Sequence, residues 1–283
     1  MQNNGMLFTV VYPQALCFFD DFCRCALNQT RKDFDLIIVN DGCDSAELKS
    51  RLDGLNVTIL DSAGGIAQNR LLGIDFARTH HYKYVLFCDA DDTFAGNRYE
   101  RTVREFENTE TDIVVSNLNI VDEQLKPLIT DYFSLEIPEG RWIDKNFVKD
   151  KNVFGMSNTG IRVVALPADI IIPNTPVVDW YLFSVLLLNG LKAKYIPDAL
   201  VNYRQYNHNM IGINCFDVAS FKRLARLKHN HYRFLIDAGY SEFTALFKES
   251  VELQSVTDQE IEQLINKQLK IHKQPLWWQI IRK

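Results

Sequence analysis

The stretch YVLFCDADD, residues Tyr84 to Asp92, is a short apolar run that leads directly into three carboxylates. The apolar run predicts a buried β-strand, so the acidic cluster lies at the carboxyl end of that strand. Open α/β sheets bind their ligands at this edge. Asp89 and Asp91 would repel one another there unless a hard divalent cation neutralised them. We therefore expect a Mg²⁺ or Mn²⁺ site that holds a diphosphate. The alternative is an acidic turn that caps the next helix.

The first half of the chain alternates strand-like and helix-like segments on either side of this stretch. Strands are predicted at residues 7–12, 36–40, 57–60, 84–88 and 112–118, and helices at 20–28, 46–52, 66–79 and 98–108. Alternation of this kind predicts an α/β fold with a largely parallel, doubly wound sheet.

The second half is less regular. After an irregular segment at 122–158, we expect a helix at 178–189, two short strands at 194–198 and 200–203, and helices from Phe216 onward. Irregular loops beside a rigid sheet are where binding residues gather. We divide the chain into an α/β domain, residues 1–215, and a helical C-terminal extension, residues 216–283.

Composition narrows the class of protein. The 283 residues are 47% hydrophobic and 24% charged, which is ordinary for a globular protein. A net charge of −5 argues against a nucleic-acid-binding surface. The six cysteines show no zinc-site or CxxC spacing, and no apolar run reaches membrane-spanning length. With no secretory signal pattern at the start, we expect a cytoplasmic protein.

Two further segments place polar residues or glycines after predicted strands. Asp41 could accept a hydrogen bond from a base N–H or a ribose hydroxyl, although the Asn-Asp-Gly sequence around it is also typical of a turn. Gly64 and Gly65 precede a helix, and glycine lets a ligand approach the backbone closely. A helix N-terminus also favours an anion. The alternative for the two glycines is a plain left-handed turn.

Together, a series of motifs between Phe8 and Gly212 resembles the GT-A fold family 2 glycosyltransferases. The motifs are Asn28-Gln29-Thr30, Asn40-Asp41-Gly42-Cys43-Asp44, Gly64-Gly65 with Gln68-Asn69-Arg70, Asp89-Ala90-Asp91-Asp92, Val178-Asp179-Trp180 and Tyr203-Arg204-Gln205-Tyr206-Asn207-His208. The resemblance implies a Rossmann-like, mostly parallel sheet flanked by helices. It also implies a nucleoside diphosphate sugar as donor and Mn²⁺ or Mg²⁺ as cofactor.

The resemblance also implies roles for the acidic residues. Asp91 would bind the metal directly, while Asp89 would face the ribose and reach the ion. Asp92 would brace the loop or a metal-bound water. Asp179 would be the general base, although aspartate at the start of a predicted helix is also a good structural N-terminal residue.

The remaining site residues follow from the same motifs. The nucleotide sugar would contact Tyr12, Pro13, Asp41, Gly65, Asn69, Arg70, Asp89 and Ala90. His208 is a further candidate metal ligand, and the alternative is a surface histidine. Arg204 and Lys194 could offset diphosphate charge, and the alternative is that both are solvated surface cations.

Two departures from the family pattern concern the nucleotide. The first loop, Val10 to Ala15, is about two residues short compared with the pattern and lacks the Asn that normally follows the Tyr. The Arg-Asn pair on the glycine-rich helix is represented by Gln68-Asn69, with Arg70 one step later. The departures leave open which base is bound, and a UDP-sugar is the default donor.

The implied reaction is an inverting transfer of a hexosyl or N-acetylhexosaminyl group to an acceptor hydroxyl of a glycan or lipid-linked glycan, as in surface polysaccharide synthesis. A nucleotidyltransferase would carry a glycine-rich loop with Arg and Lys, which the segment from Tyr12 to Cys17 lacks. The other alternative is a catalytically silent binding or scaffold protein on the same fold.

The C-terminal segment carries an aromatic pair, Trp277-Trp278, beside aliphatic and cationic residues. Such a segment suits peripheral attachment to the inner face of a membrane. The alternative is a segment docked on the catalytic domain or on a second subunit of a homo-oligomer.

Overall fold

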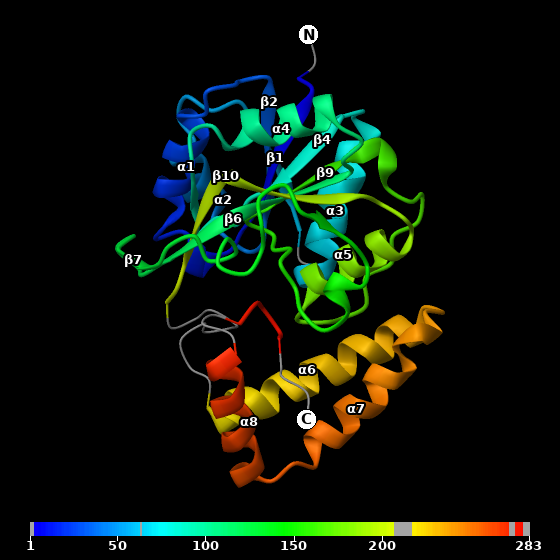
Figure 1. Ribbon diagram of the computed structural model, residues 1–283. Helices are drawn as coiled ribbons and strands as arrows, with labels where there is room; N and C mark the ends of the chain where they lie inside the picture. The colour runs from blue at the N-terminus through cyan, green and yellow to red at the C-terminus, as the bar shows by residue number, and fades with distance from the viewer. Residues whose placement is uncertain (1–2, 63, 207–216, 272–274, 280–283) are drawn as a thin grey trace.

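The computed structural model describes residues 3–62, 64–206, 217–271 and 275–279 (Figure 1). Within these residues, ten strands form one sheet: β1 (Gly5–Val11), β2 (Phe34–Asn40), β3 (Val57–Asp61), β4 (Tyr84–Phe87), β5 (Thr93–Phe94), β6 (Ile113–Val121), β7 (Pro127–Ile129), β8 (Trp142–Ile143), β9 (Thr159–Arg162) and β10 (Ala193–Arg204).

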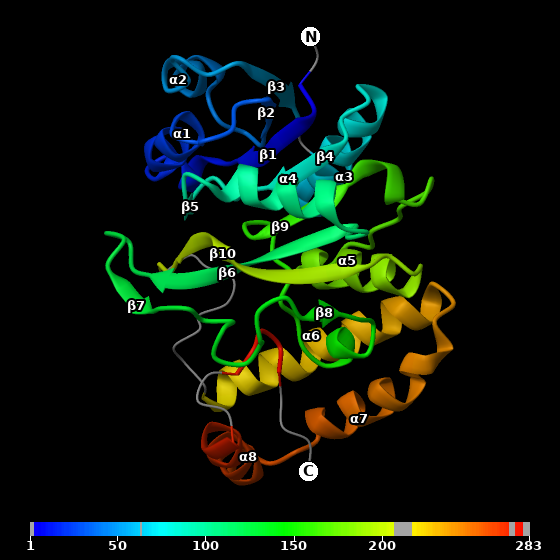
Figure 2. The same ribbon diagram turned by 45° about the horizontal axis from the view of Figure 1, so that its top comes forward.

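Helices cover this sheet and continue beyond it. They are α1 (Phe19–Leu27), α2 (Ser45–Ser50), α3 (Gly65–Thr79), α4 (Arg98–Asn108), α5 (Val178–Leu188), α6 (Val218–Asp237), α7 (Thr244–Gln254) and α8 (Asp258–Ile271). Short 3-10 turns lie at η1 (Pro13–Ala15), η2 (Phe147–Lys149), η3 (Val163–Ala165) and η4 (Ser241–Phe243). Figure 2 shows α6, α7 and α8 as a separate layer beneath the sheet and α5.

The sheet runs in the order β3-β2-β1-β4-β9-β6-β10-β5, with β7 paired to β6 and β8 paired to β10. The pairs β1–β2, β2–β3, β1–β4 and β6–β10 are parallel. Strand β9 is antiparallel to both β4 and β6, between which it lies. The predicted mostly parallel α/β sheet is confirmed, and the carboxyl ends of β1, β2 and β4 share one edge.

Continuous apolar runs explain why the central strands lie in the core. Every residue of β1 and β4 is buried, as expected for parallel strands covered on both faces. Phe8 and Phe87 meet edge to face, with their ring centroids 5.9 Å apart. Helix α3 comes close to Phe8 at Gly73, where an added Cβ would lie 2.3 Å from the ring.

One strand prediction was wrong. The two short strands expected at 194–198 and 200–203 are a single strand, β10, which pairs with β6 along both parts. The register against β6 shifts between Ile196 and Val201. Pro197 lies inside that interval and has no amide hydrogen to donate to the ladder, which accounts for the irregularity.

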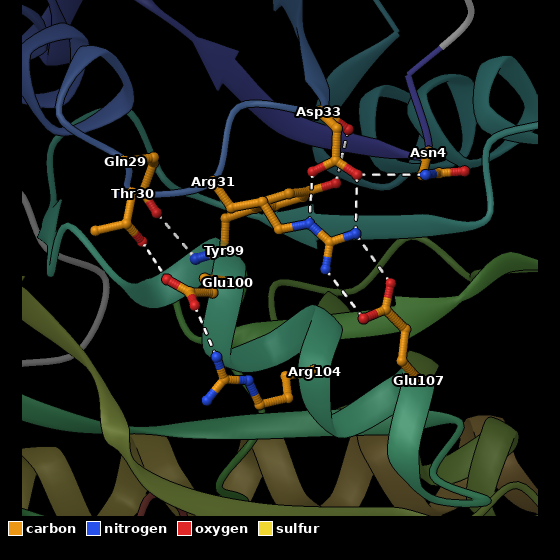
Figure 3. A network of polar contacts seen from close by, with 9 residues as sticks. All are labelled: Asn4, Gln29, Thr30, Arg31, Asp33, Tyr99, Glu100, Arg104 and Glu107. Atoms are coloured by element: carbon orange, nitrogen blue, oxygen red, sulfur yellow. Dashed lines mark hydrogen bonds and ion pairs between the residues drawn. The ribbon is translucent and has the colours of Figure 1, made fainter.

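At the opposite edge of the sheet, where β1 and β2 begin, charged and polar side chains form a network of hydrogen bonds and ion pairs (Figure 3). Arg31 binds Asp33 through two hydrogen bonds of 2.6 and 2.9 Å and also binds Glu107 of α4. Asn4 donates to the same Asp33 carboxylate. The Arg31 guanidinium holds the pKa of Asp33 and of Glu107 below their usual values. The network ties the chain before β2 to α4 and leaves the carboxyl edge open.

The helical part after residue 216 is confirmed, and it packs on the sheet domain. Trp180 of α5 stacks on His231 of α6, with centroids 3.7 Å apart and planes 12° apart. The segment 275–279 returns to the sheet domain, where Trp277 forms a bridge with Asn152. No helix in the described part of the chain is both long and apolar enough to span a bilayer.

Candidate functional site

A pocket of about 530 Å³ opens at the carboxyl edge of the sheet. The predicted site residues that line it are Tyr12, Pro13, Asp41, Asn69, Arg70, Asp89, Asp91 and Asp179. They come from the ends of β1, β2 and β4 and from the first turns of α3 and α5. The structure therefore brings most of the predicted site into one place.

Asp92 holds the acidic loop, residues 89–92, in place. This carboxylate is buried, accepts a hydrogen bond of 2.7 Å from the backbone N–H of Arg204, and also accepts from the Ser157 hydroxyl. Burial is the main cause that raises its pKa well above the usual value. Asp92 braces the loop, as expected.

Asp91 faces the pocket from a buried position. Its Oδ2 accepts hydrogen bonds from the hydroxyls of Tyr12 at 3.1 Å and Tyr206 at 2.5 Å. Burial and the neighbouring charge of Asp89 raise the pKa of Asp91. Because its two donors are neutral hydroxyls, this carboxylate is a place where a cation would be strongly favoured.

Asp89 is fixed on both sides. Its Oδ1 accepts a hydrogen bond of 2.7 Å from Arg70, and its Oδ2 accepts one of 2.9 Å from Ser157. Arg70 lies on the first turns of α3 with its side chain only 12% exposed. Gln68, at the position of the family's Arg, is exposed and does not line the pocket. The helix therefore directs Asn69 and Arg70 to the ligand side.

Asn69 presents an unused donor to this pocket. The side chain is 1% exposed, and its Oδ1 accepts from Ser62 at 2.6 Å. Its Nδ2 has no hydrogen-bond partner among the described residues, and neither does the buried Nε of Arg70. Buried polar atoms without partners are rare in proteins, and two N–H donors beside one pocket fit an anionic ligand.

Asp41 is placed by its neighbour Asn40. The Asn40 side chain accepts from the backbone N–H of Cys43 at 2.8 Å and donates to Asp61 at 3.1 Å, so it closes the turn after β2. The backbone N–H of Asp41 donates to Val11 at 2.8 Å. With its backbone held in this way, Asp41 directs its carboxylate to the pocket.

Asp179 is the second residue of α5 and shares the pocket with Asp89. Its Oδ1 accepts from the backbone N–H of Trp180 at 2.7 Å, and the amide of Asn152 lies 3.5 Å from Oδ2. Burial raises the pKa of Asp179 to about 7. A carboxylate with a pKa near neutrality is suited to accept a proton.

Two of the predicted site residues that the structure describes do not take part in this arrangement. Gly65 begins α3 with φ +78° and is exposed, whereas Ala90 is fully buried. Neither lines the pocket. His208 lies outside the described residues.

Both expectations for Arg204 were wrong, since it is neither a diphosphate contact nor a solvated surface cation. Its side chain is 2% exposed and donates to Asp21 at 2.7 Å, to the Asp91 carbonyl at 2.8 Å and to the Glu123 carbonyl. Its role is structural, because it ties the acidic loop to α1. Lys194 also lies away from the pocket, where it pairs with Glu105 at 2.7 Å.

Sequence reasoning missed several pocket residues. They are Val10, Gln14, Ile66, Gly155, Met156, Ser157, Pro176, Val178, Tyr203, Tyr206, Trp277 and Trp278. The Trp277-Trp278 pair was visible in the sequence, where it was compatible with a membrane interface or with a docked segment, but it was not predicted as part of the site. The structure shows the alternative, a segment docked on the catalytic domain. Ser157, in an irregular segment, carries no sequence signal.

The carboxylates of this pocket supply part of the coordination shell that a hard divalent cation requires. Asp89 and Asp91 offer carboxylate oxygens, and Mg²⁺ is typically held by one or two carboxylates with substrate phosphates completing its shell. Within the described residues, no group of three or more His, Cys, Asp or Glu side chains forms a closed metal site. A two-carboxylate site open to a diphosphate is the arrangement that these residues support.

Comparisons with known proteins agree with the pocket. The sequence profile described as Glycosyl transferase family 2 matches residues 18–161. A curated relative, the uncharacterized glycosyltransferase EpsJ of Bacillus subtilis (strain 168), is 31% identical over 102 residues, which cover 34% of this chain and 29% of that protein. The chain thus matches less than a third of that relative's length.

Two solved structures share the fold. S. aureus TarS 1-349 in complex with UDP-GlcNAc is 14% identical with a TM-score of 0.62, over 87% of this chain and 72% of that one. The mannosyltransferase PcManGT from Pyrobaculum calidifontis, in complex with GDP-Man and Mn²⁺, is 12% identical with a TM-score of 0.61, over 96% and 75%. At these identities the likeness establishes the GT-A fold.

Proposed function

The chain belongs to glycosyl transferase family 2, and from this premise we propose that it transfers a sugar from a UDP-sugar donor to an acceptor hydroxyl, with inversion and with Mn²⁺ or Mg²⁺. The observation that carries the proposal is the convergence of Asp41, Asp89, Asp91 and Asp179 on one pocket at the carboxyl edge of the sheet. Open α/β sheets bind ligands at this edge.

The donor is bound by groups from two strand ends, those of β1 and β2, and from the first turns of α3. Asp41 accepts from the base or ribose, and the ring of Tyr12 lies against the nucleotide. The N–H groups of Asn69 and Arg70 that are unpaired within the described residues donate to the diphosphate, and the Arg70 guanidinium offsets part of its negative charge. Every one of these residues is already held in the pocket by the contacts described above.

Asp89 and Asp91 would hold the divalent ion. When bound, such an ion supplies a Lewis acid that neutralises the charge growing on the leaving diphosphate. Asp91, whose Oδ2 accepts from the hydroxyls of Tyr12 and Tyr206, would offer its carboxylate to this ion. Arg70 keeps Asp89 in place from the opposite side.

Asp179 acts as the general base. Its carboxylate accepts the proton of the acceptor hydroxyl as that oxygen attacks the anomeric carbon from the face opposite the diphosphate. A single displacement of this kind inverts the anomeric configuration. Retention by double displacement would need a further carboxylate as nucleophile. In the described pocket, the other carboxylates are Asp41, Asp89 and Asp91, which serve the donor.

The relatives support the donor class. TarS was solved with UDP-GlcNAc and PcManGT with GDP-Man and Mn²⁺, which are both nucleoside diphosphate sugars. We propose a hexosyl or N-acetylhexosaminyl group as the sugar and a glycan or lipid-linked glycan as the acceptor. We also propose that residues 1–215 form the transferase domain and residues 216–283 its helical extension.

A thermal-shift screen of UDP, GDP, CDP and ADP with and without Mn²⁺ tests the proposal. A ligand at a hundred times its dissociation constant stabilises the fold by about 2.7 kcal/mol, which is readily measured. We expect a metal-dependent shift with UDP. A shift with GDP alone would change the donor and keep the enzyme class. If no nucleotide shifted the protein, a silent binding protein on this fold would be the better interpretation.

A further inference from the structure

The two ends of the pocket differ in chemistry. Asp41 follows β2, the acidic pair follows β4, and β1 lies between these two strands. Trp277 lies on the other side of the acidic pair, against Tyr203 of β10 and against Gly155, which precedes β9. The acidic residues therefore lie between two ends of the pocket. The end at Asp41 is where the nucleotide would bind, and the end at Trp277 is aromatic.

Trp277 is held rigidly at that aromatic end. Its carbonyl accepts from the backbone N–H of Asn152 at 2.7 Å. Its ring meets Phe133 edge to face at 5.2 Å and Tyr203 at 5.6 Å. Gly155 permits this position, since an added Cβ would lie 3.0 Å from the indole. An aromatic surface fixed in this way is preorganised for a ligand.

The aromatic end lies beside the proposed base. Asn152, which binds the Trp277 carbonyl, also places its side-chain amide 3.5 Å from Asp179 Oδ2. The next residue, Trp278, stacks on Trp180 with planes 5° apart and centroids 6.1 Å apart. Trp180 in turn donates its backbone N–H to Asp179. The C-terminal segment and the base are thus parts of one packed unit.

We propose that Trp277 is the acceptor platform of this enzyme: its ring stacks on the C–H face of a hexopyranose and holds that sugar's hydroxyl toward Asp179. The inference rests on the proposed function and names the acceptor class, a sugar ring, free or at the end of a longer glycan. A pyranose carries hydroxyls around its rim and C–H groups on its faces. It therefore matches an aromatic side chain that lines the same pocket as a carboxylate.

A nucleobase is less suited than a sugar ring to stack on Trp277. Asp41 and Tyr12, which are suited to a base, lie with β2 and β1, on the far side of the acidic pair from Trp277. A base stacked on Trp277 would place the diphosphate away from Asn69 and Arg70, which line the other end of the pocket and carry N–H groups that are unpaired among the described residues. The nucleotide of the donor and the Trp277 ring therefore lie at opposite ends of the pocket.

The test compares Trp277→Leu, which keeps an apolar side chain without a π face, with Trp277→Phe, which keeps an aromatic ring. Trp142→Leu is the matched control, because Trp142 is 50% exposed on β8 and does not line this pocket. Calorimetry with UDP and Mn²⁺ first measures donor binding in each protein. Saturation-transfer NMR then measures binding of the methyl glycosides of glucose, galactose and N-acetylglucosamine to the UDP-loaded proteins.

We expect Trp277→Leu to weaken glycoside binding about tenfold, while Trp277→Phe and Trp142→Leu stay within about threefold of wild type. UDP affinity should be the same in all four proteins. In the wild type, saturation should be strongest on the C–H protons of one pyranose face. A glycan-terminated lipid should show the same dependence on Trp277 if the sugar alone is recognised.

Four results would overturn the inference, of which the first three concern the binding measurements directly. These three are unchanged glycoside binding in Trp277→Leu, weakened UDP binding with normal glycoside binding, and a wild type that binds UDP but none of the three glycosides. Loss of binding in both Trp277→Phe and Trp277→Leu would also contradict stacking. A wild type that binds no nucleoside diphosphate with metal is a different result, because it removes the proposed function itself.

Discussion

Arg70 donates a hydrogen bond of 2.7 Å to Asp89, so a cation from the first turns of α3 is in direct contact with the first carboxylate of the acidic cluster. The family pattern places its arginine two residues earlier, where this chain has the exposed Gln68. The departure in sequence therefore leaves a positive charge at the acidic pair, where a diphosphate would be bound.

Asp91→Asn should abolish metal-dependent UDP binding and leave the fold intact. The amide is a neutral and much weaker ligand for a hard cation. The same change removes a buried charge whose pKa is raised by burial, so the mutant should not be less stable. Calorimetry with UDP and Mn²⁺ measures the binding. The exposed Asp53→Asn is the control, and unchanged affinity in Asp91→Asn would remove Asp91 as a metal ligand.

Asp179→Asn should keep donor binding and lower turnover by about a hundredfold or more, the usual scale for a lost general base. The asparagine can still accept from the Trp180 N–H, so the start of α5 should be undisturbed. Steady-state kinetics and UDP calorimetry on the same preparation separate the two effects. Near-normal turnover would show that another group takes the proton.

The pH profile of kcat/KM should rise through about 7, because Asp179 must be ionised to accept a proton and its pKa is raised to about 7. The raised pKa also means that folding favours the protonated carboxyl. Its contribution to stability is present below the unfolded pKa of about 4 and is lost as the pH rises toward 7. Urea unfolding at several pH values should show this loss in wild type and a smaller loss in Asp179→Asn, where the other buried carboxyls, Asp91 and Asp92, still contribute. A profile flat between pH values of about 5 and 8 would contradict the assignment.

Arg204→Met should destabilise the fold by about 3 kcal/mol, because it removes the buried partner of Asp21 and leaves the carbonyls of Asp91 and Glu123 without this donor. Urea denaturation measures the change. Arg104→Met is the comparison, since Arg104 is 52% exposed and should change stability by less than about 1 kcal/mol. Equal effects of the two substitutions would mean that Arg204 is not the structural anchor described here.

The strand ends could be predicted from the sequence because they combine two independent signals. An apolar run such as that before Asp89 defines a buried strand, and polar residues after it define the functional edge. Asp41 and Asp91 follow this logic, and in the structure they share one pocket with Asp179, which lies at the start of α5. Their roles in binding and catalysis stay predictions.

Other parts of the molecule carry no such signal. Strand β9 has the sequence TGIR and is placed by its antiparallel partners β4 and β6, which local periodicity cannot reveal. Tyr206 was visible only as part of a motif, although its hydroxyl lies 2.5 Å from Asp91. Trp277 lies so far along the chain from Asp179 that only tertiary packing shows that both belong to one pocket.

The order of strands in the sheet also has a kinetic consequence. Strands β1, β2 and β3 pair with near neighbours in sequence, whereas β9 must insert between β4 and β6, and Asp92 must meet the backbone of Arg204. Contacts between residues far apart in sequence require costly loop closure and form slowly. The acidic loop should therefore acquire its final shape late in folding, after the first three strands have paired. A nascent or partly refolded chain would contain those strands before it gained any affinity for its donor.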